Sequence, residues 1–344
     1  GSNDKTFELV SKVYGDHPKV RLFTKQNGGK ASALNYGIQQ SQAQFVLCID
    51  ADTQLKTDAL KQLMKYFNKD QVAAVAGSVK VGNVHNILTH WQSIEYITSQ
   101  NMDRRAFDLL NMISVVPGAI GAFRKSAVLE VGGFTTDTLA EDCDLTMRIL
   151  KAGYIVRNAS EAIAYTEAPD TVGMLFKQRF RWSFGVLQSF WKNKQTLLNP
   201  RYGYFGMVGM PNILIFQIIL PLFAPLADIF MLFSLVSGLF SLSEVNGISW
   251  TGIAGLFSLH TGFGQVMFYY FLFVVVDIFF AAIAFKLEGE KLVNLIYLFP
   301  QRFFWRQLMY FVLFKSVRKA IKGELNTWGT LKRTGGVKQV TASE

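Results

Sequence analysis

The sequence predicts an α/β domain over residues 1–200, transmembrane helices over 201–286 and a basic tail over 287–344. The first prediction rests on short apolar runs that alternate with segments of helical spacing, which is typical of a mostly parallel sheet with helices on both faces. The second rests on charge: no Lys or Arg lies between Tyr202 and Phe285, in a chain of 344 residues with a formal net charge of +10. With 50% hydrophobic residues, the chain is too apolar to be disordered.

The elements of the first domain follow from local patterns. Strands are predicted where apolar or β-branched residues cluster: Lys19–Lys25, Phe45–Asp50 and Val72–Val81. Helices are predicted where apolar residues recur at helical spacing: Lys30–Ser41, Thr57–Lys69, Leu139–Gly153 and Thr171 to about Leu198. Thr57 is expected to cap the second helix, and Gly153 is expected to end the third. Ligands of such sheets bind at the carboxyl ends of the strands, so the polar residues there matter most.

A pair of carboxylates directly follows the strand that begins at Phe45. Asp50 and Asp52 stand in alternate positions after the apolar run that ends at Ile49. Two carboxylates at the end of a buried strand require a neutralising partner, and Mg²⁺ is typically held by one or two carboxylates together with substrate phosphates. A solvated loop that caps a helix is the alternative. The residues by themselves leave both interpretations open.

Two glycine-containing segments suit the close approach of a ligand. Gly28 and Gly29 precede Lys30 at a predicted helix N-terminus, where free backbone amides and one lysine form a phosphate-binding corner. The segment Val116–Arg124, which includes Gly118, is rich in small residues that let a bulky group approach the backbone. A plain turn and a tight hairpin are the alternatives for these two segments.

Acidic residues open the helix predicted over Leu139–Gly153. Glu141 and Asp142 lie in its first turn, followed by Asp144. The helix dipole favours acids there, so on local grounds a capping role explains them better than a catalytic one.

Three side chains share one face of the aromatic-rich helix that begins at Thr171. Gln178, Arg181 and Trp182 stand at positions i, i+3 and i+4. A guanidinium suits a diphosphate and an indole suits the apolar face of a sugar ring. The alternative is an amphipathic helix that lies on a membrane through its Phe residues, and different faces of one helix can serve both purposes.

Two apolar segments, Phe205–Phe240 and Gly264–Phe285, are long enough to cross a bilayer. The first is too long for a single crossing. Its break at Pro221–Pro225 suggests a tight helical hairpin, or one span followed by an interfacial segment. A third apolar segment, Phe303–Phe314, contains Arg306 and is predicted as an interfacial helix.

The charged first domain and the basic tail are both expected on the cytoplasmic side, by the positive-inside rule. The number of crossings is then even, and two is favoured over four. Basic residues of the tail flank lipid-length segments, so they are expected to contact anionic headgroups and no nucleic acid. Cys48 and Cys143 fit a reducing compartment rather than a disulfide scaffold.

The order of these motifs resembles that of the processive family-2 glycosyltransferases, which include poly-N-acetylglucosamine, hyaluronan, chitin and cellulose synthases. The Gln178–Trp182 stretch is the most specific element, and the Arg306–Tyr310 and Trp328–Gly335 stretches resemble the bacterial poly-N-acetylglucosamine synthase branch. The resemblance implies a GT-A-type nucleotide-sugar-binding domain. The first residues, Gly1–Thr6, resemble the tail of the family's Asp-Gly-Ser-x-Asp-x-Thr motif. The first strand, its uridine-binding Asp and N-terminal spans are therefore expected to be missing from this chain.

The resemblance also implies roles for individual residues. Asp50 and Asp52 would hold a divalent cation, Mg²⁺ or Mn²⁺, with Asp52 as the direct ligand. Lys30 would contact the nucleotide-sugar donor, and Asp142 would be the general base. The remaining implied residues surround the acceptor end and the departing diphosphate: Gly118, Glu141, Gln178, Arg181, which also binds the donor, and Trp182.

The implied function is polymerisation of a UDP-sugar, with UDP-GlcNAc favoured, by an inverting β-glycosyltransferase. The implied location is the bacterial inner membrane, crossed several times, with the catalytic domain in the cytoplasm. Implied partners are the UDP-sugar donor, the growing polysaccharide, the bilayer and an accessory membrane subunit. A synthase of cellulose or hyaluronan type and a transferase to polyprenyl phosphate stay open as alternatives. A transporter is disfavoured, because Asp228 and Asp277 are the only ionised candidates inside the spans.

Overall fold

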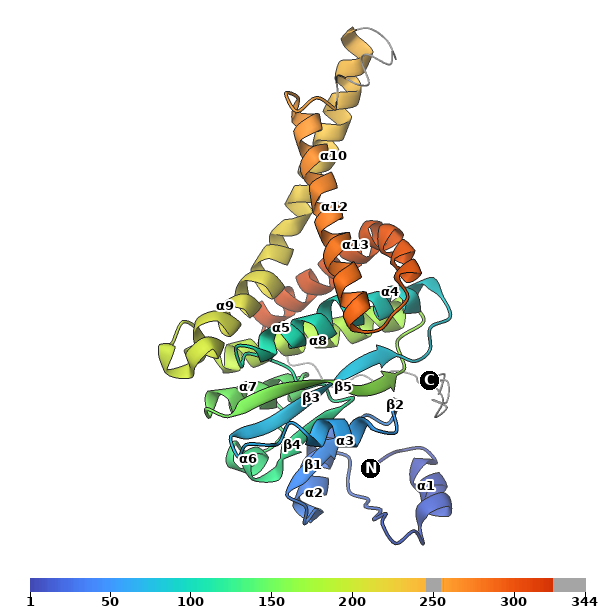
Figure 1. Ribbon diagram of the computed structural model, residues 1–344, viewed down its shortest axis with the longest axis vertical. Helices are drawn as coiled ribbons and strands as arrows, with labels where there is room; N and C mark the ends of the chain where they lie inside the picture. Colours follow the sequence, from blue (N-terminus) through green and yellow to red (C-terminus); the bar gives the residue numbers. More distant parts are fainter. Residues whose placement is uncertain (246–254, 256, 324–344) are drawn as a thin grey trace.

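The computed structural model describes residues 1–245, 255 and 257–323. A five-stranded sheet forms the body of the first domain, and two long apolar helices extend away from it (Figure 1). Helices α4 (Ile87–Glu95), α5 (Met102–Asp108) and α8 (Val172–Lys192) lie between the sheet and the long helices.

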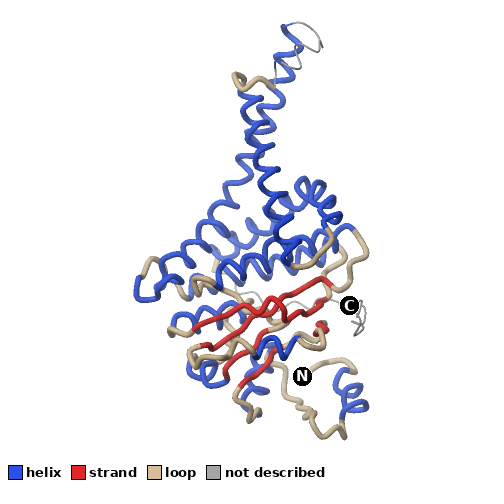
Figure 2. The backbone as a smooth tube through the Cα atoms, viewed as in Figure 1, coloured by secondary structure: helices blue, strands red, loops and turns tan. Residues whose placement is uncertain are grey.

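The sheet is mixed rather than mostly parallel, so that prediction is wrong. Figure 2 shows its strands gathered in one layer. Its strands follow the spatial order β1 (Phe45–Cys48), β4 (Gly121–Arg124), β3 (Val72–Val81), β5 (Ile155–Thr166) and β2 (Thr53–Leu55). Among the described strands, β3 and β5 form the one parallel pair, and the other three pairs are antiparallel. The two strands that run against their neighbours, β2 and β4, have only three and four residues. Such short strands leave no hydrophobic pattern from which a direction can be predicted.

The central strand β3 is buried on both faces. Ala74 belongs to a core cluster that includes Leu145 of α7 (Glu141–Lys151), whereas its neighbour Val75 belongs to a second cluster that includes Leu63. Successive residues of a strand point to opposite faces, so β3 contributes to both cores. Each fully buried Val or Leu stabilises the fold by about 1.5–3 kcal/mol.

Two local predictions are wrong. In the described chain, Lys19–Lys25 forms no strand, because no neighbouring strand offers it a ladder of hydrogen bonds. Helix α3 (Ala59–Met64) is shorter than Thr57–Lys69, and its N-cap residue is Asp58. Thr57 therefore does not cap this helix.

Three predicted helices are present close to their expected bounds. Helix α2 (Gly29–Gln40) begins at the glycine pair, and α7 is followed by Gly153 with φ of +87°. A positive φ at this position favours glycine, as predicted. Helix α8 is capped by the Thr171 side chain and ends six residues before Leu198. The remaining short helices of this domain are α1 (Thr6–Tyr14), the π-helical turn η1 (Tyr96–Asn101), α6 (Lys125–Glu130) and the 3₁₀ turn η2 (Lys194–Thr196).

Two helical segments are long and apolar enough to cross a membrane, judged by length and composition: Phe205–Gly238 and Gly262–Leu287. In each, only 6% of the most apolar stretch is buried, so these segments are not the core of a soluble domain. The first is continuous through η4 (Phe205–Gly209), α9 (Met210–Asn212), η5 (Ile213–Ile219) and α10 (Leu220–Val245), and the second is α12. The predicted break at Pro221–Pro225 is therefore wrong. Pro225 removes one backbone hydrogen bond, and the remaining hydrogen bonds hold the helix together.

Helix α13 (Leu298–Ile321) contains the predicted interfacial segment Phe303–Phe314 and packs along α8. The Lys315 ammonium lies 4.9 Å from the ring centre of Phe176 in α8. On α10, Asp228 forms an ion pair with Arg306 and accepts a hydrogen bond of 3.0 Å from Tyr310. Helix α13 thus joins α8 to the first long helix. The Trp328–Gly335 stretch of the predicted tail lies outside the described residues.

The end of α12 is joined to the first domain by charged side chains. Glu288, directly after α12, lies 2.8 Å from Arg105 of α5, and Glu290 lies 2.7 Å from Lys80 of β3. The Glu288 side chain is only 3% exposed. The second long helix is therefore fixed to a strand and to a helix of the domain beneath it.

Candidate active site

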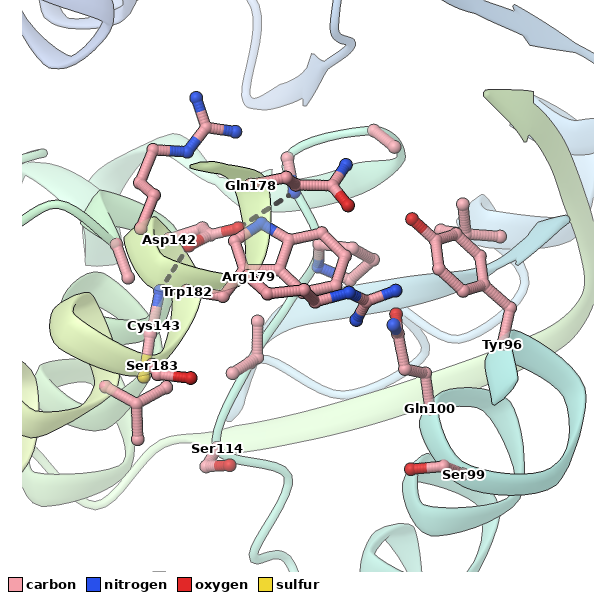
Figure 3. A pocket seen from close by; sticks show the side chains of 18 of the residues that line it. Tyr96, Ser99, Gln100, Ser114, Asp142, Cys143, Gln178, Arg179, Trp182 and Ser183 are labelled. Atoms are coloured by element: carbon pink, nitrogen blue, oxygen red, sulfur yellow. Dashed lines mark hydrogen bonds between the residues drawn. The ribbon is translucent and has the colours of Figure 1, made fainter. Parts of the chain in front are cut away.

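A cavity of about 440 Å³ lies between the strand ends, α7, α8 and the α4–η1–α5 segment (Figure 3). Nine residues were predicted as site residues from the sequence, and all nine line this cavity: Lys30, Asp50, Asp52, Gly118, Glu141, Asp142, Gln178, Arg181 and Trp182. They come from loops and helices up to 152 positions apart, so the fold brings the separate motifs to one place.

The two carboxylates after β1 have different surroundings. Oδ1 of Asp50 lies 2.6 Å from Nζ of Lys30, whose ammonium also lies 3.0 Å from Glu141. Asp52 points towards the end of β5, where its Oδ1 accepts a hydrogen bond of 3.4 Å from the hydroxyl of Thr166. Asp50 is thus paired with a cation of the chain itself, and Asp52 accepts from the Thr166 hydroxyl.

Lys30 is the central cation of this group. Burial alone would lower the pKa of Lys30, but the carboxylates of Asp50, Glu141 and Asp142 outweigh it and raise the pKa above its ordinary value. Gly118 makes room for this ammonium, because a Cβ there would lie 2.5 Å from Nζ of Lys30. The glycine-rich segment therefore permits the close approach that the sequence suggested.

The two acidic residues at the start of α7 have different partners. Glu141 is buried and faces Lys30; burial and the neighbouring Asp142 raise its pKa, although Lys30 opposes them. Asp142 is held by backbone: its Oδ2 accepts from the N–H of Gly118 at 3.2 Å, and its Oδ1 from the N–H of Cys143 at 2.8 Å. One carboxylate thus neutralises a lysine and the other is oriented towards the cavity (Figure 3).

Gly185 sets the distance between α8 and the start of α7. A Cβ at Gly185 would lie 2.6 Å from Cβ of Ala140 and 2.7 Å from its backbone N. Only a residue without a side chain allows this approach, and it holds Asp142 and Trp182 in one cavity.

The predicted face of α8 lines the cavity, as the spacing of Gln178, Arg181 and Trp182 indicated. Gln178 is 3% exposed, and its Oε1 has no hydrogen-bond partner. A buried carbonyl oxygen without a partner is available to a ligand hydroxyl or amide. Phe176 and Phe180 point elsewhere and contact Lys315 of α13, so this part of the predicted membrane-facing surface is covered by another helix.

The comparison with protein families identifies this domain. The family described as "Glycosyl transferase family group 2" matches residues 45–285. The chain belongs to this family.

Proteins similar to this family-2 glycosyltransferase include two curated synthases. The poly-beta-1,6-N-acetyl-D-glucosamine synthase of Staphylococcus aureus (strain COL) is 33% identical over 207 residues, which are 59% of this chain and 50% of that protein. The synthase of the same name from Staphylococcus epidermidis is 33% identical over 201 residues, or 57% and 49%. The chain thus spans about half the length of the curated relatives it matches.

A solved structure of similar fold is the mannosyltransferase PcManGT from Pyrobaculum calidifontis, determined in complex with GDP-Man and Mn²⁺. The TM-score is 0.57 at 18% identity, over 94% of this chain and 76% of that one. This likeness confirms the GT-A-like glycosyltransferase fold, with the mixed sheet described above.

Sequence reasoning missed several residues of the glycosyltransferase cavity. Arg179 stands inside the Gln178–Trp182 stretch, yet it was left out because it falls off the i, i+3, i+4 face. Its guanidinium forms an ion pair of 2.6 Å with Glu95 of α4. Burial raises the pKa of Glu95, although Arg179 opposes this. No local sequence pattern predicts an ion-pair partner 84 residues away.

A second missed residue is Arg104 of α5. It is 7% exposed and lines the cavity, and burial lowers its pKa to about 10. Its guanidinium donates a hydrogen bond of 2.6 Å to Oδ1 of Asn101, which also accepts from the N–H of Val79 in β3. The Asp103–Arg104 pair was a possible signal in the sequence, but adjacent charges on a helix are usually solvated.

Proposed function

We propose that this chain is the catalytic part of a membrane-embedded, processive, inverting β-glycosyltransferase that polymerises a UDP-sugar into an exported polysaccharide. One observation carries the proposal: the carboxylates after β1, Asp142 and Trp182 line the same cavity. The similarity to poly-beta-1,6-N-acetyl-D-glucosamine synthases supports UDP-GlcNAc as the donor. Because the chain spans about half of those relatives, donor and product are part of the proposal.

The donor set of the cavity fits a divalent cation. Asp50 and Asp52 provide carboxylate oxygens, the ligands that Mg²⁺ and Mn²⁺ prefer. In the described part of the chain, no cluster of three or more His, Cys, Asp or Glu could hold a metal alone. This fits a cation shared between one or two carboxylates and substrate phosphates. When bound, such a cation neutralises charge on the diphosphate; Asp52 would be its direct ligand and Asp50 its second.

Each side chain of the cavity has its own role in the proposed transfer reaction. Asp142, oriented by the N–H of Gly118, takes the proton from the acceptor hydroxyl as that oxygen attacks the anomeric carbon. The bond from this carbon to the diphosphate oxygen breaks, and UDP leaves on the opposite face. An α-linked donor therefore gives a β-linked product. Lys30 and Arg181 place positive charge beside the departing diphosphate, and Gln178 and Trp182 hold the acceptor sugar.

The two long helices cross the inner membrane in this proposal, and the catalytic domain lies in the cytoplasm. Two crossings place the domain and the tail on the same side, as the basic tail requires. Asp228 does not face lipid unpaired, because Arg306 of α13 neutralises it. Gln217 and Ile218 of the first long helix line the cavity together with α8. In this proposal the spans form part of the exit path for a polymer that cannot cross hydrocarbon unaided.

The test is a donor panel offered to the purified protein in lipid nanodiscs. UDP-GlcNAc, UDP-glucose and UDP-glucuronate are supplied one at a time with Mg²⁺ or Mn²⁺, and release of UDP and product size are measured. We expect UDP-GlcNAc to give the fastest release, a long product, and no release in excess EDTA. A single sugar attached to lipid would instead indicate a transferase to polyprenyl phosphate and would contradict the proposal.

A further inference from the structure

The indole of Trp182 is backed by a buried arginine. The Arg179 guanidinium carbon lies 4.3 Å from the centre of the Trp182 ring, one turn along the same helix. Figure 3 shows the Arg179 side chain running along the indole towards Tyr96 and Gln100, while Asp142 lies on the other side of Trp182. A guanidinium stacked on an aromatic face is attracted by the ring electrons, and more so where water is excluded.

Residues from two other helices hold Arg179 in place. Glu95, the last residue of α4, accepts one hydrogen bond of 2.9 Å from Nη1 of Arg179 at its Oε1, and its Oε2 lies 2.6 Å from Nη2 as an ion-pair contact. Trp305 of α13 lies 5.4 Å from the guanidinium carbon, and its ring meets that of Trp91 edge-on at 6.4 Å. A planar guanidinium held between a carboxylate and aromatic rings presents a flat surface that a lysine cannot reproduce.

This arrangement encloses most of the Arg179 side chain. It is 5% exposed, with Glu95 at its end and the rings of Trp182 and Trp305 near its guanidinium. The rings of Trp182 and Tyr96 are 6.2 Å apart and inclined by 38°, so they do not stack flat on each other. The orientation of the indole therefore depends on the ion pair behind it.

We propose that Glu95 and Arg179 are positioning residues that fix the Trp182 indole in the orientation that binds the acceptor sugar. The inference rests on the acceptor role of Trp182 under the proposed function. Charge alone is not the requirement: the flat guanidinium supplies the surface and Glu95 sets its angle. Helices α4 and α13 thereby shape acceptor binding through the residues that surround Arg179.

The test uses the full chain labelled with 5-fluorotryptophan and observed by ¹⁹F NMR. The chain has six Trp, and the Trp182 resonance is assigned by its loss in Trp182→Phe. We compare Arg179→Lys, Glu95→Gln and the double variant Glu95→Met/Arg179→Met. Because the double variant removes both charges together, it avoids an unpaired buried charge and is expected to fold.

We expect the Trp182 resonance to shift or broaden in all three variants. The KM for a soluble acceptor oligosaccharide should rise at least about tenfold, while the KM for the donor changes less than about twofold. The matched control is Arg148→Lys, which alters a buried pair of 2.8 Å with Asp144 outside the cavity. It should lower the melting temperature but leave the Trp182 resonance and the acceptor KM unchanged.

Two results would overturn the inference. The first is an unshifted Trp182 resonance in the well-folded double variant. The second is an unchanged acceptor KM in the pair variants when Trp182→Ala raises it. If instead the proposed function is wrong, Trp182→Ala itself leaves the acceptor KM unaltered. The Trp182 resonance in the pair variants then decides by itself whether Glu95 and Arg179 orient the indole.

Discussion

The ammonium of Lys30 lies 2.6 Å from the carboxylate of Asp50. A cation of the chain itself therefore neutralises the first of the two carboxylates that are proposed to hold a divalent cation. The same lysine lies 3.0 Å from Glu141, which links the end of β1 to the start of α7. The proposed binding of the donor and the proposed binding of the divalent cation therefore both depend on this group of three charged side chains.

Replacing Lys30 by Met should strengthen the binding of the divalent cation and weaken the binding of the donor. Without the ammonium, Asp50 and Glu141 lose their partner, so the negative charge at the site increases. We expect Mn²⁺ to bind more tightly in the absence of nucleotide, and the donor KM to rise at least about tenfold because a charge-assisted contact to the donor is lost. Isothermal titration calorimetry and initial rates measure the two effects. Weaker Mn²⁺ binding in Lys30→Met would contradict this account.

Asp142→Asn should nearly abolish transfer while donor binding is retained. General-base catalysis is typically worth about 10²–10⁴-fold, and the amide keeps the shape of the side chain without its basicity. Incorporation of radiolabelled sugar gives the rate, and calorimetry gives the affinity for UDP. The control is Asp137→Asn, whose exposed carboxylate pairs with Lys192 outside the cavity. Half of the original rate in Asp142→Asn would remove this residue from the role of base.

Two glycines of α8 provide a matched test of helix packing. At Gly185, an added Cβ would lie 2.6 Å from Ala140, so Gly185→Ala should push α8 from α7, lower the melting temperature and slow transfer. The overpacking should cost about 1–3 kcal/mol. At Gly173, nothing lies within 4 Å, and Gly173→Ala should stabilise the helix by about 0.5–1 kcal/mol. Equal activity of the two variants would show that this contact does not set the site.

Both cysteines should resist alkylation in the folded protein. Burial raises the pKa of Cys48 to about 12, and burial, with Asp142 beside it, raises the pKa of the Cys143 thiol as well. The reactive thiolate is therefore scarce at pH 8, and its fraction grows only as the pH approaches the raised pKa. Mass spectrometry after iodoacetamide should find both thiols free in folded protein and modified after unfolding. Rapid labelling of Cys143 at pH 8 would show that the cavity exposes it.

The sequence alone placed the candidate site residues on single elements. Asp50 and Asp52 follow an apolar run, Asp142 opens an amphipathic helix, and Gln178 and Trp182 recur at helical spacing; each pattern is local. Helix and strand periods gave the positions of these residues, and the resemblance to processive family-2 glycosyltransferases implied their roles; the nine residues named in this way line one cavity. The long apolar helices were predictable for the same reason, since a run of apolar residues is a property of consecutive positions.

Tertiary structure alone decided how the elements meet. The directions of β2 and β4 depend on neighbouring strands, and the unpaired Lys19–Lys25 segment shows that an apolar run is no strand without a partner. Likewise, the Glu95–Arg179 pair joins residues 84 positions apart. Periodicity shows which face of an element is apolar. It does not show which residue of another element will lie opposite a buried charge, because that is decided only when the chain folds and a buried charge must be paired.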